Sequence, residues 1–120
     1  MKTILVADDD AASRELVVEA LAGSFQLMEA ADGLEALALL RAAQPSLGLL
    51  DIRMPGLDGY AVLAEVRRDP LIHHIPMLAV TAFAMQGDRE KAFEAGFNGY
   101  MTKPVDVVAL RGIVRKLLGE

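Results

Sequence analysis

Three consecutive aspartates, Asp8 to Asp10, follow the apolar run TILVA and precede a segment with helical periodicity. Like charges placed side by side repel one another, so such a cluster needs a cation or a chemical role that offsets the repulsion. Other polar residues follow apolar runs in the same way: Asp51 ends LGLLD, Thr81 ends PMLAVT, and Lys103 comes directly after NGYMT. Together, these residue types could form a reactive site.

Carboxylates, a hydroxyl and an ammonium group around one cavity are the components of a phosphoryl-transfer site. The carboxylates of Asp8, Asp9 and Asp51 offer oxygen ligands, which hard divalent cations such as Mg²⁺ prefer. In such a site, the metal and Lys103 counter the charge of the phosphoryl oxygens, and Thr81 donates a hydrogen bond. One of the aspartates is then the nucleophile that attacks phosphorus.

The alternation of apolar runs with amphipathic segments predicts five β/α units. The expected strands are residues 3–7, 25–30, 47–51, 76–81 and 98–102. The expected helices include residues 13–21, 31–43 and 58–68 and a last helix with apolar positions between 110 and 118. Asp10 is expected to lie at the start of the first helix. Asp32 and Glu35 have capping-box spacing, which predicts the start of the second helix. Asp58 is placed to cap a third helix.

This order of elements predicts an α/β fold, a (βα)5 doubly wound sheet with five parallel strands. Parallel strands joined by right-handed crossovers place their functional site at the carboxyl ends of the strands. The residues that follow the first, third, fourth and fifth apolar runs are therefore expected to meet at one edge of the sheet.

Composition bounds the protein class. A chain of 120 residues fits one domain. The sequence has no cysteine, which excludes disulfides, thiolate catalysis and zinc–thiolate sites. A net charge of −5 without a basic cluster argues against direct nucleic-acid binding. The apolar runs are too short for membrane insertion and the start does not resemble a signal peptide, so a cytoplasmic location is expected.

The segments ILVADDD, LLDIRMPGLDGY, AVTAFA and GYMTKPVD resemble, in order and spacing, the receiver domain of two-component response regulators. The resemblance covers residues 1–120, which it implies form a single receiver domain with the flavodoxin-like strand order 2-1-3-4-5. The stretch IPMLAVTAFAMQGDREKAFEAG is similar to single-domain cell-cycle regulators and to the receivers of hybrid kinases.

The resemblance implies a specific role for each site residue. Asp51 would accept a phosphoryl group from a phosphohistidine on a sensor histidine kinase or a histidine phosphotransfer protein. Mg²⁺ would be bound by Asp9, Asp51 and the backbone carbonyl of Arg53, with Asp8 acting mainly through water. Lys103 would contact the phosphoryl oxygens.

A switch would follow phosphorylation. Thr81 would turn toward the phosphoryl group while Tyr100, otherwise a half-buried packing residue, rotates inward. The fourth helix, fifth strand and fifth helix would form the output face, which could bind a second copy of the chain or a downstream protein target. Apolar groups expected on that face are Phe83, Met85 and Phe97.

Further expectations concern the surroundings of the site. The family's kinase-docking surface corresponds here to Ser13, Arg14 and Val17 with the loop after Asp51, and the Lys103–Pro104 peptide is expected to be cis. The positions that influence phosphoryl hydrolysis in the family hold Arg53 and Phe83. Neither side chain can accept a hydrogen bond from an attacking water, so slow hydrolysis is expected. The chain would catalyse its own phosphorylation and dephosphorylation without being a turnover enzyme.

Two other functions remain open from the sequence. Asp8 and Asp10 have the DxD spacing of haloacid-dehalogenase phosphotransferases, with Asp8 as the nucleophile, although Ala12 replaces the threonine or valine of that motif and no cap domain fits. Alternatively, the fold could serve as a docking module without phosphorylation. That function leaves the acidic cluster without a purpose that offsets its repulsion.

Overall fold

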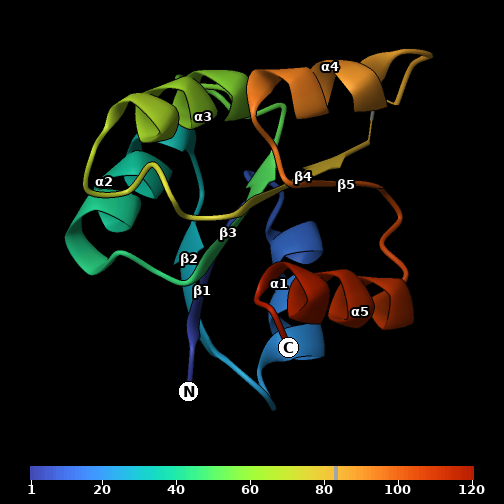
Figure 1. The fold of residues 1–120 in the computed structure, drawn as a ribbon. Helices are drawn as coiled ribbons and strands as arrows, with labels where there is room; N and C mark the ends of the chain where they lie inside the picture. Colours follow the sequence, from blue (N-terminus) through green and yellow to red (C-terminus); the bar gives the residue numbers. More distant parts are fainter. Residues whose placement is uncertain (83) are drawn as a thin grey trace.

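A single parallel sheet organises the molecule. The computed structural model describes residues 1–82 and 84–120. Within this part of the chain, the strands pair in the order β2-β1-β3-β4-β5, and every pair is parallel (Figure 1). The strands are β1 (Thr3–Ala7), β2 (Gln26–Ala30), β3 (Leu47–Asp51), β4 (Met77–Thr81) and β5 (Gly99–Thr102). The predicted α/β class and strand order are confirmed.

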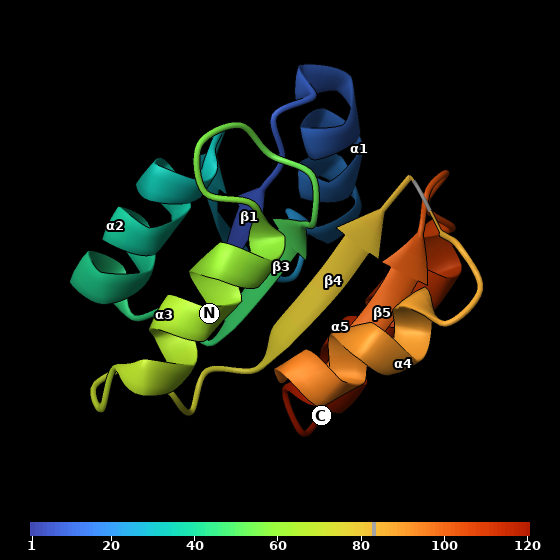
Figure 2. The same cartoon turned by 90° about the horizontal axis from the view of Figure 1, so that it is seen from above.

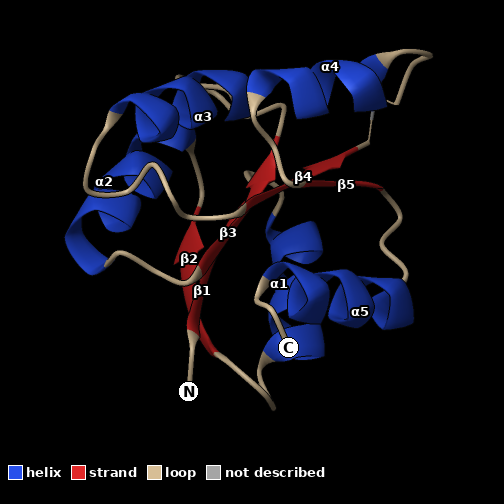
Figure 3. Ribbon diagram, viewed as in Figure 1, coloured by secondary structure: helices blue, strands red, loops and turns tan. Residues whose placement is uncertain are grey.

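Helices cover both faces of the sheet, as Figure 3 shows. They are α1 (Ala11–Leu21), α2 (Gly33–Ala43), α3 (Gly59–Arg68), α4 (Asp88–Ala95) and α5 (Val107–Leu117). α1 and α5 pack on one face, whereas α2, α3 and α4 pack on the other (Figure 2). None of the helices in the described part of the chain has the length and apolar character needed to cross a bilayer.

Each face of the sheet has its own hydrophobic core because successive side chains of a strand point to opposite faces. In β1, Leu5 and Ala7 enter the core beneath α2 and α3, while Ile4 and Val6 enter the core beneath α1 and α5. All of them are almost fully buried. β1 is thereby held from both sides, and the residue that follows it has a fixed position.

Aspartates cap four of the helices. Their side chains accept hydrogen bonds from backbone N–H groups in the first turns of α1, α2, α3 and α5, and these caps are Asp10, Asp32, Asp58 and Asp106. In α2, Glu35 Oε1 also accepts a hydrogen bond from the N–H of Ala31 at 3.0 Å. The helix starts predicted from Asp10, Asp32 and Asp58 are confirmed.

Some boundaries differ from the predicted ones. α1 begins at Ala11, two residues before the predicted start, because the Asp10 cap allows the helix to begin immediately after it. β2, β4 and β5 each begin one residue later than predicted. The N–H of Phe25 bonds to Leu21 O at the end of α1 and not to the sheet, and Pro76 has no N–H to donate.

Candidate functional site

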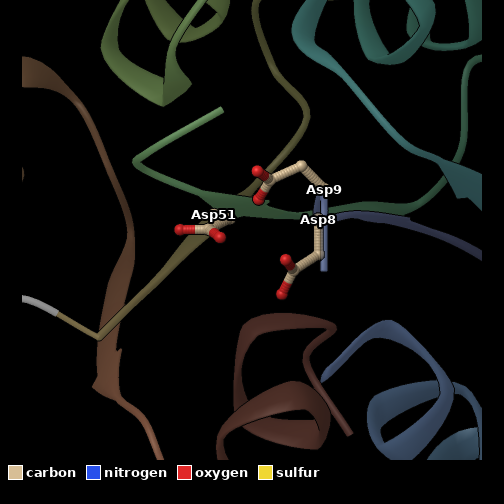
Figure 4. Close-up of side chains that lie close together, drawn as sticks. All are labelled: Asp8, Asp9 and Asp51. Atoms are coloured by element: carbon tan, nitrogen blue, oxygen red, sulfur yellow. The ribbon is translucent and has the colours of Figure 1, made fainter. Parts of the chain in front are cut away.

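Three aspartates meet at the carboxyl edge of the sheet, where β1 and β3 end. Carboxylate oxygens of Asp8, Asp9 and Asp51 lie within 4.8 Å of one another (Figure 4). Asp8 and Asp51 are buried, whereas Asp9 is exposed. The strand order therefore produces the convergence that the sequence predicts, and the cluster offers an all-oxygen ligand set of the kind that Mg²⁺ prefers.

Lys103 supplies the positive charge nearest to this cluster. Its Nζ lies 2.8 Å from Asp8 Oδ2 and 3.1 Å from Asp51 Oδ2. The side chain of Lys103 is only 16% exposed, so water screens these ion pairs weakly. The Lys103–Pro104 peptide is cis, as predicted. The N–H of Lys103 also donates to Thr81 O at 2.8 Å, which ties the start of this loop to the end of β4.

The cluster shifts the ionisation of its own members. Burial raises the pKa of Asp51, and the charge of Asp8 raises it further, although the hydrogen bond from Lys103 opposes both effects. Burial alone would lower the pKa of Lys103, but its hydrogen bonds to Asp8 and Asp51 outweigh this effect, so its pKa is raised. Asp8 and Asp51 therefore share the ammonium group of Lys103. A further cation at the cluster would lower the electrostatic repulsion among the carboxylates.

Thr81 and Arg53 flank Asp51. Thr81 ends β4 and is buried, while Arg53 is exposed and its backbone N–H donates to Asp51 Oδ1 at 3.1 Å. Between them lies a cavity of about 150 Å³, lined by Ile52, Arg53, Tyr60, Thr81, Met85, Asp88 and Lys91. The cavity extends from Arg53 and Thr81 to the first turn of α4. The carbonyl of Arg53 remains a predicted metal ligand.

Tyr100 is buried more deeply than predicted. Its residue is 9% exposed, and its hydroxyl has no hydrogen-bond partner within the described chain. The ring packs in the same core as Phe97, whose ring makes an edge-to-face contact with Tyr60 at 5.8 Å between centroids. Tyr100 thus already points inward, and a buried hydroxyl without a hydrogen-bond partner costs free energy of desolvation.

Three residues that were expected on the surface either are buried in the structure or lie outside the described residues. Phe97 is 3% exposed and belongs to the core beneath α3 and α4, so it is not an output-face residue. Val17 is 4% exposed, and the apolar group that α1 presents beside the site is Leu16, at 41%. Met85 is exposed at 73%, as predicted. Phe83 lies outside the described residues.

Asp10 does not join the acidic cluster. Its carboxylate accepts hydrogen bonds from Ser13 Oγ and from the N–H of Ala12, and these bonds lower its pKa. The DxD interpretation, in which Asp8 and Asp10 act together, therefore lacks the geometry it needs. A contact that the sequence reasoning missed is Arg14, whose Nη1 donates to Asp8 O at 2.6 Å. The sequence feature that could have indicated this contact is the position of Arg14, one helical turn after the Asp10 cap.

Comparisons with known proteins support one family. The family model of the response regulator receiver domain matches residues 4–115. Response regulator PleD of Caulobacter vibrioides is 40% identical over 115 residues, which cover 95% of this chain and 25% of PleD. The polar-differentiation response regulator DivK of Brucella anthropi is 33% identical, with coverage of 99% and 98%. The chain thus spans a quarter of PleD but nearly all of DivK.

A solved structure agrees with this result. The receiver domain of a sensor histidine kinase from Pseudomonas aeruginosa, crystallised with a magnesium ion in its active-site cleft, superposes with a TM-score of 0.90. It is 31% identical, and the match covers 99% of this chain and 98% of that one. Neither the haloacid-dehalogenase function nor the phosphorylation-independent one is favoured. The chain belongs to the response regulator receiver domains, signalling modules with a phosphoacceptor role in two-component systems.

Proposed function

We propose that Asp51 is the phosphoacceptor of this receiver domain. The observation that carries the proposal is its environment: Asp51 is buried at the end of β3, with Lys103 Nζ 3.1 Å from Oδ2 and the N–H of Arg53 3.1 Å from Oδ1. Asp8 and Asp9 complete the acidic cluster around it. Asp9 is exposed, and Asp8 has an equivalent pair of contacts, from Lys103 Nζ at 2.8 Å and from the N–H of Asp10 at 2.9 Å. Asp51 differs from Asp8 in that its strand, β3, pairs with β4, which ends at Thr81.

In the proposed reaction, a carboxylate oxygen of Asp51 attacks the phosphorus of a phosphohistidine. The new O–P bond forms as the P–N bond breaks, and the imidazole leaves with the bonding electron pair and takes up a proton from solvent. Lys103 stabilises the charge of the phosphoryl oxygens, and the Thr81 hydroxyl donates to one of them. Later hydrolysis by water breaks the O–P bond and returns the carboxylate and inorganic phosphate.

We infer that Asp8, Asp9 and Asp51, with the carbonyl of Arg53, hold Mg²⁺. Support comes from the donor set, which consists of oxygen atoms within 4.8 Å of one another for the three carboxylates. When bound, the ion would supply positive charge that neutralises the carboxylates and the phosphoryl oxygens. Asp8, which already bonds to Lys103, would act mainly through water.

We also propose how phosphorylation is read. Thr81 would turn toward the phosphoryl group, and movement of β4 would provide the Tyr100 hydroxyl with a partner that it does not have among the described residues. The face formed by α4, β5 and α5 would then change its binding to a second copy or to a downstream protein. A cavity of about 450 Å³ lies on this face, lined by Arg89, Tyr100, Met101, Thr102, Pro104, Asp106, Ala109 and Ile113. Changed hydrogen exchange confined to other elements would contradict this output face.

The partner that supplies the phosphoryl group would dock beside the site. A hollow of about 260 Å³ between α1 and the loop after β5 is lined by Asp8, Ala12, Ser13, Leu16, Val17, Val80, Lys103, Pro104 and Val105. Its apolar lining and the presence of Asp8 among the lining residues suit a sensor histidine kinase or a histidine phosphotransfer protein. We further propose that residues 1–120 act as one receiver domain in the cytoplasm.

The test uses acetyl phosphate with Mg²⁺ and intact-mass measurement. Wild type should gain one phosphoryl group, and Asp51→Asn should gain none. Asp58→Asn is the matched control because Asp58 is an exposed helix cap at the end of the loop that follows Asp51. Undiminished labelling of Asp51→Asn would contradict the assignment. A result in which Asp58→Asn loses labelling while Asp51→Asn retains it would also contradict the assignment.

A further inference from the structure

Asp8 and Asp9 are consecutive, yet both carboxylates reach the same site. In a regular strand, neighbouring side chains point to opposite faces, so the two could not converge if β1 continued. β1 ends at Ala7, and the chain bends at Asp9. Figure 4 shows the Asp9 side chain directed toward Asp51 and the Asp8 side chain on the other side of the strand end, and one carboxylate oxygen of each lies within 4.8 Å of the others. The conformation of the Asp8–Asp9 peptide therefore determines whether the ligand set exists.

Arg14 holds that peptide. The N–H of Asp8 still bonds to Ala30 O at 3.0 Å, as the last rung of the β1–β2 ladder. β2 ends at Ala30 and offers no further donor for the carbonyl of Asp8. Nη1 of Arg14 takes this role with a hydrogen bond of 2.6 Å to Asp8 O.

The guanidinium is itself anchored. Arg14 Nε donates to Glu29 Oε1 at 3.0 Å, and the side chain of Arg14 is only 19% exposed. Because a guanidinium is planar and presents several donors in a fixed fork, these two contacts set its position between α1 and β2. A lysine could offer its charge but not both bonds in the same geometry.

Asp9 depends most on this arrangement. Asp8 and Asp51 each bond to Lys103, but within the described chain the Asp9 carboxylate has neither a hydrogen bond nor an ion pair. The backbone alone directs it into the cluster. A fixed Asp8 carbonyl fixes the plane of the Asp8–Asp9 peptide. It therefore also fixes the direction from which the Asp9 carboxylate enters the cluster.

We propose that Arg14 is a positioning residue for the divalent-cation site: by clamping the Asp8 carbonyl it orients Asp9 and thereby sets the affinity for Mg²⁺. This inference rests on the proposed metal site, and it differs from a docking role of Arg14 on the kinase-facing surface. A docking role would affect transfer from a protein donor and leave Mg²⁺ affinity unchanged.

The test measures Mg²⁺ binding to the intact chain by calorimetry, in wild type, Arg14→Gln and Arg14→Lys. Loss of an outer contact that orients a metal ligand typically weakens binding about tenfold, which is the expected result for Arg14→Gln. Arg14→Lys should weaken it about threefold, because the charge remains while the fork is lost. Arg111→Gln is the matched control, since Arg111 Nε donates to a helix carbonyl, Ala20 O at 2.9 Å, away from the site.

A second readout separates positioning from a general structural effect. With acetyl phosphate as the donor, the Mg²⁺ concentration for half-maximal labelling should rise in the Arg14 variants, while the rate at saturating Mg²⁺ approaches that of wild type. If Arg14→Gln does not fold, Arg14→Lys decides. Mg²⁺ affinity within twofold of wild type in the folded variants, or a rate defect that saturating Mg²⁺ does not correct, overturns the inference. Failure of wild type to bind Mg²⁺ or to be labelled would instead refute the proposed function.

Discussion

The two edges of the sheet use partly buried cations in opposite ways. At the amino edge of β4 and β5, the hydrogen bonds that the guanidinium of Arg67 makes within the described residues all go to neutral oxygens. Nε and Nη2 bond to Gly96 O at 3.1 and 2.7 Å, and Nη1 bonds to the carbonyls of His73 and Ile75, both at 2.8 Å. Nη2 also bonds to Asn98 Oδ1 at 2.7 Å. One side chain therefore links the end of α3, the approach to β4, the end of α4 and the approach to β5.

At the carboxyl edge, a single ammonium group faces several carboxylates. Lys103 pairs with Asp8 and Asp51, while Asp9 lies in the same cluster without a pair in the described chain. The guanidinium at the amino edge has hydrogen-bond acceptors for each of its nitrogen atoms, whereas at the carboxyl edge the described chain pairs one ammonium group with two of the three clustered carboxylates. The difference separates a cation that joins elements of the fold at one edge of the sheet from an acidic cluster at the other edge that would respond to an added cation.

The largest effect on stability is expected at the amino edge. Arg67→Ala should lower the free energy of unfolding by about 3 kcal/mol, because several charge-assisted hydrogen bonds are lost at once. Chemical denaturation with and without Mg²⁺ measures this, and Mg²⁺ should not restore the loss. The neighbouring Arg68→Ala is the control. The side chain of Arg68 is 70% exposed, and its ion pair in the described chain is with Glu65, so a change below about 0.5 kcal/mol is expected. Equal losses of unfolding free energy in Arg67→Ala and Arg68→Ala would contradict the stabilising role of the Arg67 hydrogen bonds.

A smaller loss is expected when the cation at the other edge is removed. Lys103→Gln leaves Asp8 and Asp51 without their ammonium partner and should cost about 2 kcal/mol in Mg²⁺-free buffer. Here saturating Mg²⁺ should restore most of the stability, because it replaces the missing positive charge. Stability of this variant that is insensitive to Mg²⁺ would contradict the proposed function of the cluster.

The pH dependence of the Lys103 effect has a defined sign. The pKa of Lys103 is raised in the folded state, so its contribution is present in full below the unfolded-state value of about 10.4. The contribution is lost as the pH rises through the higher folded-state pKa. Unfolding free energies of wild type and Lys103→Gln should therefore converge in that alkaline range, and a difference that persists there would have another origin.

The next effect concerns magnesium itself. At a concentration ten times its Kd, Mg²⁺ should stabilise the wild type by about 1.4 kcal/mol. Because the pKa of Asp51 is raised, protons compete with the metal as the pH falls through that pKa, and the stabilisation should diminish in this direction. Thermal unfolding at several pH values measures it, with Asp9→Asn as the variant that should respond least. Stabilisation that grows as the pH falls would be incompatible with carboxylate ligands.

Sequence patterns predicted the carboxyl edge far better than the amino edge. Asp8, Asp51 and Thr81 follow apolar runs directly, so strand order alone brings them together. Arg67, in contrast, stands among polar residues of an amphipathic helix, and nothing local distinguishes it from the exposed Arg68. Its partners come from loops whose approach depends on tertiary packing.

Burial of aromatic side chains was also beyond the local pattern. Phe97 precedes β5 and could equally face solvent or core. Its position is set by α4 and by its contact with Tyr60. Tyr100 alternates correctly along β5, but its full burial requires α4 to lie over it, and the length of the loop before α4 does not determine that placement.

The smallest predicted effect is on the lifetime of the phosphorylated state. Hydrolysis needs a water molecule in line with the phosphorus, and a side chain that accepts a hydrogen bond from that water would speed the reaction. Arg53 is exposed next to the site, and its guanidinium carries donors but no acceptor; a phenyl ring such as that of Phe83 carries neither. The double variant Arg53→Asn with Phe83→Glu should therefore lose its phosphoryl group several-fold faster than wild type, with each single variant in between. Decay of the purified phosphoprotein in Mg²⁺ buffer measures this, and Arg68→Asn provides the control. If the double variant decays no faster, solvent access and not hydrogen-bond acceptance limits hydrolysis at the carboxyl edge.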